Sequence, residues 1–201
     1  MDELITAYSA LLGRVDTWFA GCMARHGESI ACGKGCSECC HGLFDITLLD
    51  AALLLQGFER LPEATRKEVV GRCEAILERL RRFWPDLSHP FILNIREEEA
   101  WEEVMPEDDD TPCPLLALDG SCLLYDYRPM TCRLNGLPLF NLDGEPFHDE
   151  WCTNNFIDTD VTLLTDLRFG FHQLFRDELA LFHRFTQRLI GETHSELDTL
   201  I

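Results

Sequence analysis

Apolar residues recur at spacings of three and four over residues 3–26, the pattern of a helix face that packs against a core. Gly27 follows directly, so we predict that this helix ends there. Thr47 and Asp50 then begin a second apolar run, in which Thr47 suits the N-cap position and Gly57 is a stop signal. A third helix is predicted to start near Pro62, because proline fits the first helical turn, and to end near Phe83.

The strongest helical pattern covers residues 159–190, where apolar residues form a broad stripe. In the segment 112–140, four prolines prevent long helices, and Asp119-Gly120 between two apolar runs predicts a hairpin turn. We therefore expect a mainly α fold with a small α+β content. A helical-bundle scaffold would carry an irregular layer rich in cysteine and proline, with a short hairpin.

The length of 201 residues fits a single domain over residues 1–201. We expect its cysteine-cluster region, 32–152, to be flanked by the N-terminal helix 3–26 and the C-terminal helix 159–190.

The charge balance is strongly acidic, with 17 Lys and Arg against 36 Asp and Glu and a formal net charge of −19. Such a surface repels phosphate backbones and anionic lipids, so we expect neither a nucleic-acid nor a membrane partner. The acidic start of the chain is unlike a secretory signal, and no apolar run approaches the roughly 20 residues that span a bilayer. These features predict a cytoplasmic protein whose thiols stay reduced. The acidic segment 96–110 is expected to be a short helix followed by a solvated loop.

The ten cysteines fall into two groups. Cys22 and Cys73 lie on apolar faces of predicted helices, where a thiol behaves as a small hydrophobic group. The other eight lie in predicted loops and turns, and they are Cys32, Cys36, Cys39, Cys40, Cys113, Cys122, Cys132 and Cys152. Eight thiols are two sets of four, the number that closes a tetrahedral zinc site or holds an iron–sulfur cluster. The eight cysteines are therefore the predicted metal ligands.

The stretch "CGKGCSECC" at 32–40 has local features that favour chelation. Its glycines allow tight turns, and Cys36-x-x-Cys39 has the usual spacing for two ligands of one ion. Cys39 and Cys40 are adjacent, and neighbouring side chains of an extended backbone point to opposite sides. The sequence is therefore compatible with either one or two metal centres. It does not determine which four cysteines share an ion.

Polar residues beside the cysteines are candidates for supporting contacts. Four thiolates on Zn²⁺ leave a net negative charge, which nearby cations offset. The predicted supporting residues are Lys34, Asp126, Arg128 and Arg133. His41 and His148 are alternative ligands. Structural disulfides are disfavoured by the reducing compartment, and a metal-free redox dithiol is disfavoured because the chain lacks a βαβ pattern.

The chain resembles the bacterial CxxCxxCC-type cysteine-cluster family, described as a zinc- or iron-chelating domain. The matching parts span about residues 32–152, and they are "CGKGCSECC" (32–40), "PCPLL" (112–116), "GSCLLYDYRPMTCR" (120–133) and Cys152. The chain departs from the family name at one point, because three residues rather than two separate Cys32 from Cys36. The resemblance implies a bound metal and specifies no reaction.

The sequence thus predicts a metal-binding protein that holds zinc or an iron–sulfur cluster through eight cysteines. An alternative is a metal-dependent oxidoreductase or modifying enzyme with polar groups next to the metal, such as Asp126, Tyr127, Arg128, Asn135 or His148. A further alternative is a metal chelator or delivery protein with exchangeable thiols. Whether the protein is an enzyme stays open.

Overall fold

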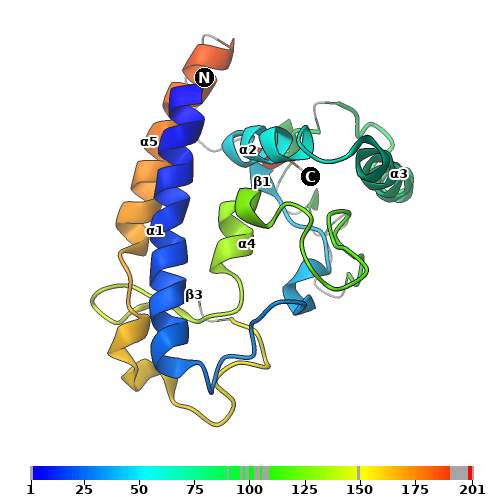
Figure 1. The fold of residues 1–201 in the computed structure, drawn as a ribbon. Coiled ribbons are helices and arrows are strands. Elements are labelled where there is room, and N and C mark those ends of the chain that lie inside the picture. Colours follow the sequence, from blue (N-terminus) through cyan, green and yellow to red (C-terminus); the bar gives the residue numbers. More distant parts are fainter. Residues whose placement is uncertain are drawn as a thin grey trace. The chain divides into compact units, whose positions relative to one another are not determined.

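The computed structural model describes residues 2–89, 91–95, 97, 100–101, 105, 109–148, 150–190 and 199–200. Five α-helices occur in these residues: α1 (Asp2–His26), α2 (Leu48–Phe58), α3 (Glu63–Leu80), α4 (Met130–Leu134) and α5 (Phe171–Ile190) (Figure 1). Two antiparallel pairs of short strands accompany them. They are β1 (Ile46–Thr47) with β4 (Thr199–Leu200), and β2 (Leu139–Phe140) with β3 (Pro146–His148). The prediction of a mainly α fold is confirmed.

The chain divides into two compact units. The first unit contains residues 1–39 and 130–195, and the second unit contains residues 40–129 and 196–201. The division falls between Cys39 and Cys40, inside the cysteine-rich stretch.

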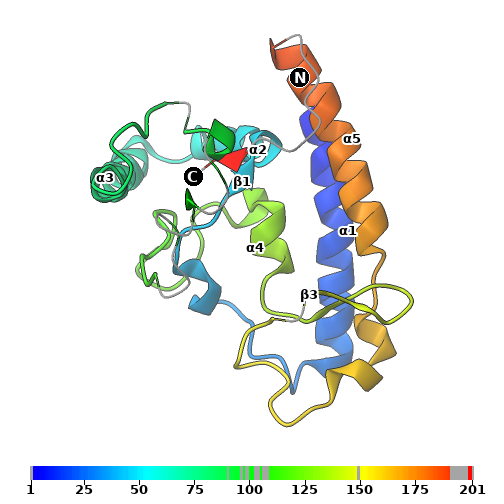
Figure 2. The same ribbon diagram turned by 180° about the vertical axis from the view of Figure 1, so that it is seen from behind.

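The first unit is built on α1 and α5, which lie side by side and antiparallel (Figures 1 and 2). Helix α1 follows the predicted range closely and buries the apolar face expected from its sequence. Inside the pair, the Tyr8 hydroxyl donates to the buried Glu178 carboxylate at 3.0 Å. The short helix α4 packs on α1, where Arg133 donates to Asp16. These contacts fix α4, which carries Cys132, against the helix pair.

Helix α5 begins at Phe171, so the predicted start at residue 159 is wrong. The side chain of Asp160 accepts the backbone N–H of Thr162 at 3.1 Å, which starts only one 3₁₀ turn. Leu164 then leaves the helical region, with φ −88° and ψ 87°. Val161 and Leu167 of this stretch still reach the core from successive turns, whereas Leu163 is exposed. Apolar spacing alone therefore overestimated the helix.

In the second unit, α2 begins as the sequence predicts. Thr47 accepts the N–H of Asp50 at 3.1 Å, and the Asp50 carboxylate accepts the N–H of Thr47 at 3.2 Å, a reciprocal capping box. Gly57 is not the end of this helix, which continues to Phe58. A side chain at Gly57 would lie 2.5 Å from the ring of Tyr127, so the glycine makes room for that ring.

Helix α3 ends at Leu80, three residues before the predicted end. Leu80 joins Trp84, Leu87 and Leu93 in a small buried core of the second unit. The predicted hairpin turn is present, because Gly120 donates to the carbonyl of Ala117 at 3.0 Å and has φ +78°. Most of the predicted acidic helix at 96–110 lies outside the described residues.

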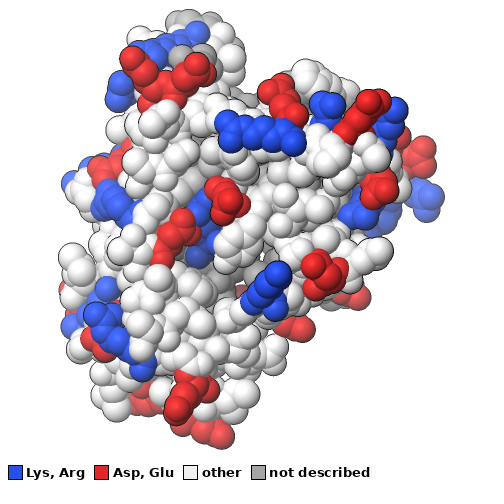
Figure 3. All heavy atoms as spheres, viewed as in Figure 1, with Lys and Arg blue, Asp and Glu red and all other residues white. Residues whose placement is uncertain are grey.

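Acidic side chains are spread over the face seen in Figure 3, with basic side chains among them. They do not gather in a single patch on that face. None of the helices in the described parts of the chain has the length and apolar character needed to cross a bilayer.

Candidate metal centre

In the first unit, the segment that carries Cys32, Cys36 and Cys39 forms a tight turn. The backbone N–H of Cys36 donates to the carbonyl of Gly33 at 3.0 Å, and Gly35 has φ +88°. A positive φ favours glycine, which explains why the sequence has one at this position. Cys36 and Cys39 are exposed, whereas Cys32 is half-buried.

Asn155, which is only 2% exposed, holds the beginning of this segment. Its Oδ1 accepts the backbone N–H of Ala31 at 2.7 Å, and its Nδ2 donates to the Cys32 sulfur at 3.2 Å. The backbone N–H of Asn155 donates to the carbonyl of Cys152 at 2.9 Å. One buried residue thus ties the Cys32 segment to the Cys152 segment.

Gly136, just after α4, lies on the other side of the Cys32 sulfur. Its carbonyl accepts the Nδ2 of Asn155 at 2.5 Å, and its φ is +102°. A Cβ at this position would lie 3.0 Å from the sulfur of Cys32. The glycine therefore leaves the space that this sulfur occupies.

The pKa of the Cys32 thiol is raised by its surroundings. Burial raises the pKa of the Cys32 thiol, the Asn155 amide lowers it in part, and the charges of Cys36, Cys152 and Cys39 raise it further. Asn155 links Cys32 and Cys152, which are 120 residues apart in sequence.

The neighbouring thiols do not yet have the spacing of bound ligands. Among the described residues, no group of three or more His, Cys, Asp or Glu side chains is close enough to hold a metal ion. A tetrahedral zinc site with Zn–S bonds of about 2.3 Å would bring its sulfurs to about 3.8 Å from one another. Binding would therefore require the sulfurs to come closer together than they are in this structure.

All ten cysteines are free thiols. Cys22 is fully buried on α1, and burial raises its pKa to about 11, so it is protonated near neutral pH. Cys73 on α3 is half-buried, and burial raises its pKa as well. Both agree with the interpretation of these two residues as small hydrophobic groups.

In the second unit, Cys40 and Cys113 are brought together by their backbones. The N–H of Cys113 donates to the carbonyl of Cys40 at 2.8 Å, and His41 pairs with Pro112 in an antiparallel bridge. The N–H of Gly42 donates to the carbonyl of Thr111 at 2.9 Å. Segments 40–42 and 111–113 therefore run side by side.

Asp109 anchors this pair of segments. Its carboxylate accepts the N–H of Leu43 at 3.2 Å, the N–H of Thr111 at 3.1 Å, and the Thr111 hydroxyl. Arg79 of α3 donates to both oxygens, at 3.3 and 3.4 Å. Burial acts to raise the pKa of Asp109, but the contacts with Thr111 and Arg79 outweigh it, so the pKa lies below 3.8. The sequence predicted a solvated loop at the end of the acidic segment, and this prediction is wrong for Asp109.

Cys122 lies on the second side of the hairpin, where it is paired with Leu116 in an antiparallel bridge. Cys113 precedes Leu116 by three residues. Burial raises the pKa of the Cys122 thiol, while the backbone N–H of Leu124 and the charge of Arg128 lower it in part. The guanidinium of Arg128 also stacks 3.7 Å above the ring of Tyr125. Arg128, predicted as a supporting residue, thus acts on the Cys122 thiol.

The remaining predicted residues have diverse surroundings. Arg133 is buried and pairs with Asp16 of α1, so it supports α4. Lys34 is exposed in the cysteine turn, and Asp126 is exposed in a 3₁₀ turn (Tyr125–Tyr127). Tyr127, a candidate for the enzymatic alternative, packs on α2 and accepts a hydrogen bond from Arg60.

Both histidines that the sequence offered as alternative ligands are exposed. His41 lies in the backbone bridge to Pro112, and His148 lies on β3, where it is paired with Leu139. Cys132 is half-buried on α4 of the first unit.

Sequence reasoning missed Asn155, Gly136 and Asp109. Asn155 follows Cys152 by three residues, and Gly136 follows Cys132 by four, so proximity to a cysteine was the available signal. Their roles depend on contacts between residues that are far apart in sequence, which no local pattern encodes.

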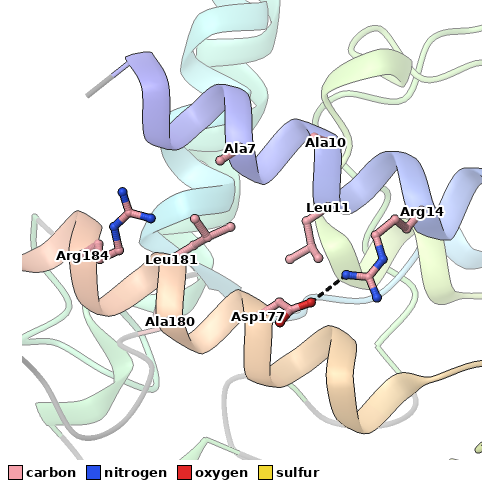
Figure 4. Close-up of a pocket in the computed structure, with 8 residues that line it drawn as sticks. All are labelled: Ala7, Ala10, Leu11, Arg14, Asp177, Ala180, Leu181 and Arg184. Carbon is pink, nitrogen blue, oxygen red and sulfur yellow. Dashed lines mark hydrogen bonds and ion pairs between the residues drawn. The ribbon is translucent and has the colours of Figure 1, made fainter.

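A shallow groove elsewhere in the first unit lies between α1 and α5 (Figure 4). Its floor and walls are small or apolar side chains, and the Arg14–Asp177 ion pair at 2.6 Å crosses one end. No cysteine or histidine lines it, so it has none of the ligand chemistry discussed above. Comparison of the chain with protein-family models, curated proteins and solved structures finds no match.

Proposed function

We propose that the protein binds a metal through cysteine thiolates, and that Cys32, Cys36, Cys39 and Cys152 of the first unit share one centre. The observation that carries this proposal is that Asn155 joins two cysteine segments far apart in sequence. Its Nδ2 donates to the Cys32 sulfur at 3.2 Å, its backbone N–H donates to the Cys152 carbonyl at 2.9 Å, and Cys36 and Cys39 follow Cys32 in the same turn-containing segment. Four sulfur donors match the ligand number of a zinc site or an iron–sulfur cluster.

The surroundings of the four thiols suit such a centre. Gly136 leaves space beside the Cys32 sulfur, and the Asn155 amide donates to that sulfur. Conversely, four neighbouring thiolates repel one another, so a cation among them would offset an unfavourable interaction. The donor set and its support therefore fit the metal that the resemblance implies.

The four cysteines would have two different roles in binding the ion. Cys32 and Cys152 are positioned by the Asn155 contacts, and the exposed Cys36 and Cys39 would close over the ion from the glycine-containing turn. Each thiol would release its proton on binding. The metal would supply a structural cross-link as zinc or an electron-carrying centre as an iron–sulfur cluster.

The test is purification without oxygen, followed by elemental analysis per chain and a visible spectrum. A brown protein with iron and sulfide identifies an iron–sulfur cluster, and a colourless protein with stoichiometric zinc identifies a zinc site. A protein that contains neither metal, and takes up neither zinc nor iron with sulfide on reconstitution, would refute the proposal.

A second function, metal delivery, is favoured by the exposure of Cys36 and Cys39. Exposed thiols give a competing chelator direct access to the ion, so delivery predicts rapid loss of the metal to a mild competitor. A site that retains its ion under the same conditions is structural or catalytic instead. Stopped-flow measurement of zinc transfer to a chromophoric chelator distinguishes the two cases.

A further inference from the structure

Asn155 makes contacts that go beyond holding a loop. Its side chain is buried, and both of its functional atoms have partners from other segments. The carbonyl Oδ1 accepts from Ala31, while the Nδ2 group donates to the Gly136 carbonyl and to the Cys32 sulfur. The amide thus has both of its N–H donors and its acceptor engaged.

The orientation of this amide is determined by its partners. If the oxygen and nitrogen were exchanged, Oδ1 would face the Gly136 carbonyl, and Nδ2 would face the N–H of Ala31. Two hydrogen-bond acceptors would then face each other at 2.5 Å, and two donors would face each other at 2.7 Å. The N–H donor is therefore directed at the Cys32 sulfur.

We propose that Asn155 is a positioning residue of the metal centre, which donates an N–H to the metal-bound Cys32 thiolate and fixes the Cys152 segment beside it. The inference rests on the proposed function and names a residue that tunes the same site. Hydrogen bonds to metal-bound sulfur withdraw electron density and are among the outer contacts that set metal affinity and potential.

The decisive comparison is between Asn155→Asp and Asn154→Asp. The first variant keeps an oxygen for Ala31 but replaces the donor near Cys32 with a second oxygen. The second adds the same charge at the exposed neighbouring residue and leaves the donor intact. Zinc affinity is measured by chelator competition, and Co²⁺-loaded protein reports the sulfur-to-metal charge-transfer band.

Asn155→Asp is expected to weaken zinc binding by about 10- to 100-fold, the usual cost of losing an outer-shell partner. Its charge-transfer band should move to lower energy, because the Cys32 sulfur no longer shares electron density with a donor. Asn154→Asp should match the wild type in both respects. Equal affinity and an unchanged band in Asn155→Asp, or an equal loss in Asn154→Asp, would overturn the inference.

A wild-type protein that binds neither zinc nor Co²⁺ would instead contradict the proposed function itself. If Asn155→Asp does not fold, as judged by circular dichroism, the wild type loaded with ¹¹³Cd decides the question. A scalar coupling between a side-chain amide proton of Asn155 and ¹¹³Cd is expected through the N–H···S hydrogen bond. The absence of that coupling in a cadmium-bound protein would overturn the role of Asn155.

Discussion

The two units of the molecule hold their cysteines by different means. In the first unit, the neutral amide side chain of Asn155 donates to the Cys32 sulfur, and Gly136 leaves the space that this sulfur occupies. In the second unit, the carboxylate of Asp109 and a backbone bridge fix the main chain that carries Cys40 and Cys113. The Asn155 contact in the first unit is therefore made to a sulfur atom, whereas the Asp109 and bridge contacts in the second unit are made to the main chain.

This difference has an energetic consequence. Thiols that gather around Cys32 raise its pKa, so forming several thiolates there without a cation is unfavourable. In the second unit, the pKa of Cys122 is raised by burial and lowered in part by the backbone N–H of Leu124 and the Arg128 charge. A cation beside Cys32 would offset the unfavourable interaction between thiolates there.

The largest effect is expected from removing one thiol of the first-unit cluster. Cys32→Ser or Cys152→Ser should weaken zinc binding by more than about 100-fold, the upper range for loss of an outer-shell partner. Cys22→Ala is the matched control, because Cys22 lies in the same unit but is buried as a protonated thiol. If chelator competition gives the same affinity for Cys152→Ser and Cys22→Ala, the four-thiol assignment is wrong.

Asp109→Ala tests the backbone anchor of the second unit. The change leaves the N–H groups of Leu43 and Thr111 without their carboxylate acceptor, so we expect a loss of about 1–3 kcal/mol in the free energy of unfolding. Urea unfolding measures it, with Asp110→Ala at the exposed neighbouring residue as the control. Zinc binding by the first unit should not change.

The same variant has a defined pH dependence. The folded pKa of Asp109 lies below its ordinary value of 3.8, so the carboxylate stabilises the fold fully above that value. This contribution is lost as the pH falls through the folded pKa. The stability difference between wild type and Asp109→Ala should therefore shrink in acid, and a difference that grows below pH 4 would contradict the assigned role.

Two glycines of the second unit are predicted to respond in opposite directions to substitution by alanine. Gly57→Ala places a methyl group 2.5 Å from the Tyr127 ring, and such overpacking costs about 1–3 kcal/mol. Gly71→Ala, on α3 with no atom within 4 Å of the added carbon, should stabilise by about 0.5–1 kcal/mol through helix propensity. Thermal unfolding that shows equal effects of the two variants would refute the packing of Tyr127 on α2.

The parts predicted best from sequence are those with local causes. The range of α1 follows from its apolar spacing, and the start of α2 follows from the Thr47–Asp50 capping box. The early part of 159–190 was misassigned, because Asp160 starts a 3₁₀ turn and Leu164 interrupts it, although the apolar spacing continues. Spacing does not report the backbone conformation, and Leu163, which fits the apolar spacing, is exposed.

The sequence indicated which residue types could bind a metal, but it did not indicate how those residues are arranged in space. The eight candidate cysteines were selected by their count and turn-rich context, although Cys132 lies on α4, and no spacing indicates that Asn155 links Cys32 and Cys152. That relation depends on Asn155 and Gly136, whose contacts span 123 and 19 residues of sequence. Metal binding by Cys40, Cys113, Cys122 and Cys132 stays a prediction.

The most direct measurement of the central claim is alkylation of the metal-loaded protein, mapped by mass spectrometry before and after removal of the metal. We predict that Cys32, Cys36, Cys39 and Cys152 are protected together in the loaded protein and become reactive together when a chelator removes the ion. Cys22 should stay unreactive throughout, because it is fully buried. Rapid labelling of Cys36 or Cys39 while the metal remains bound would contradict a shared four-thiol centre.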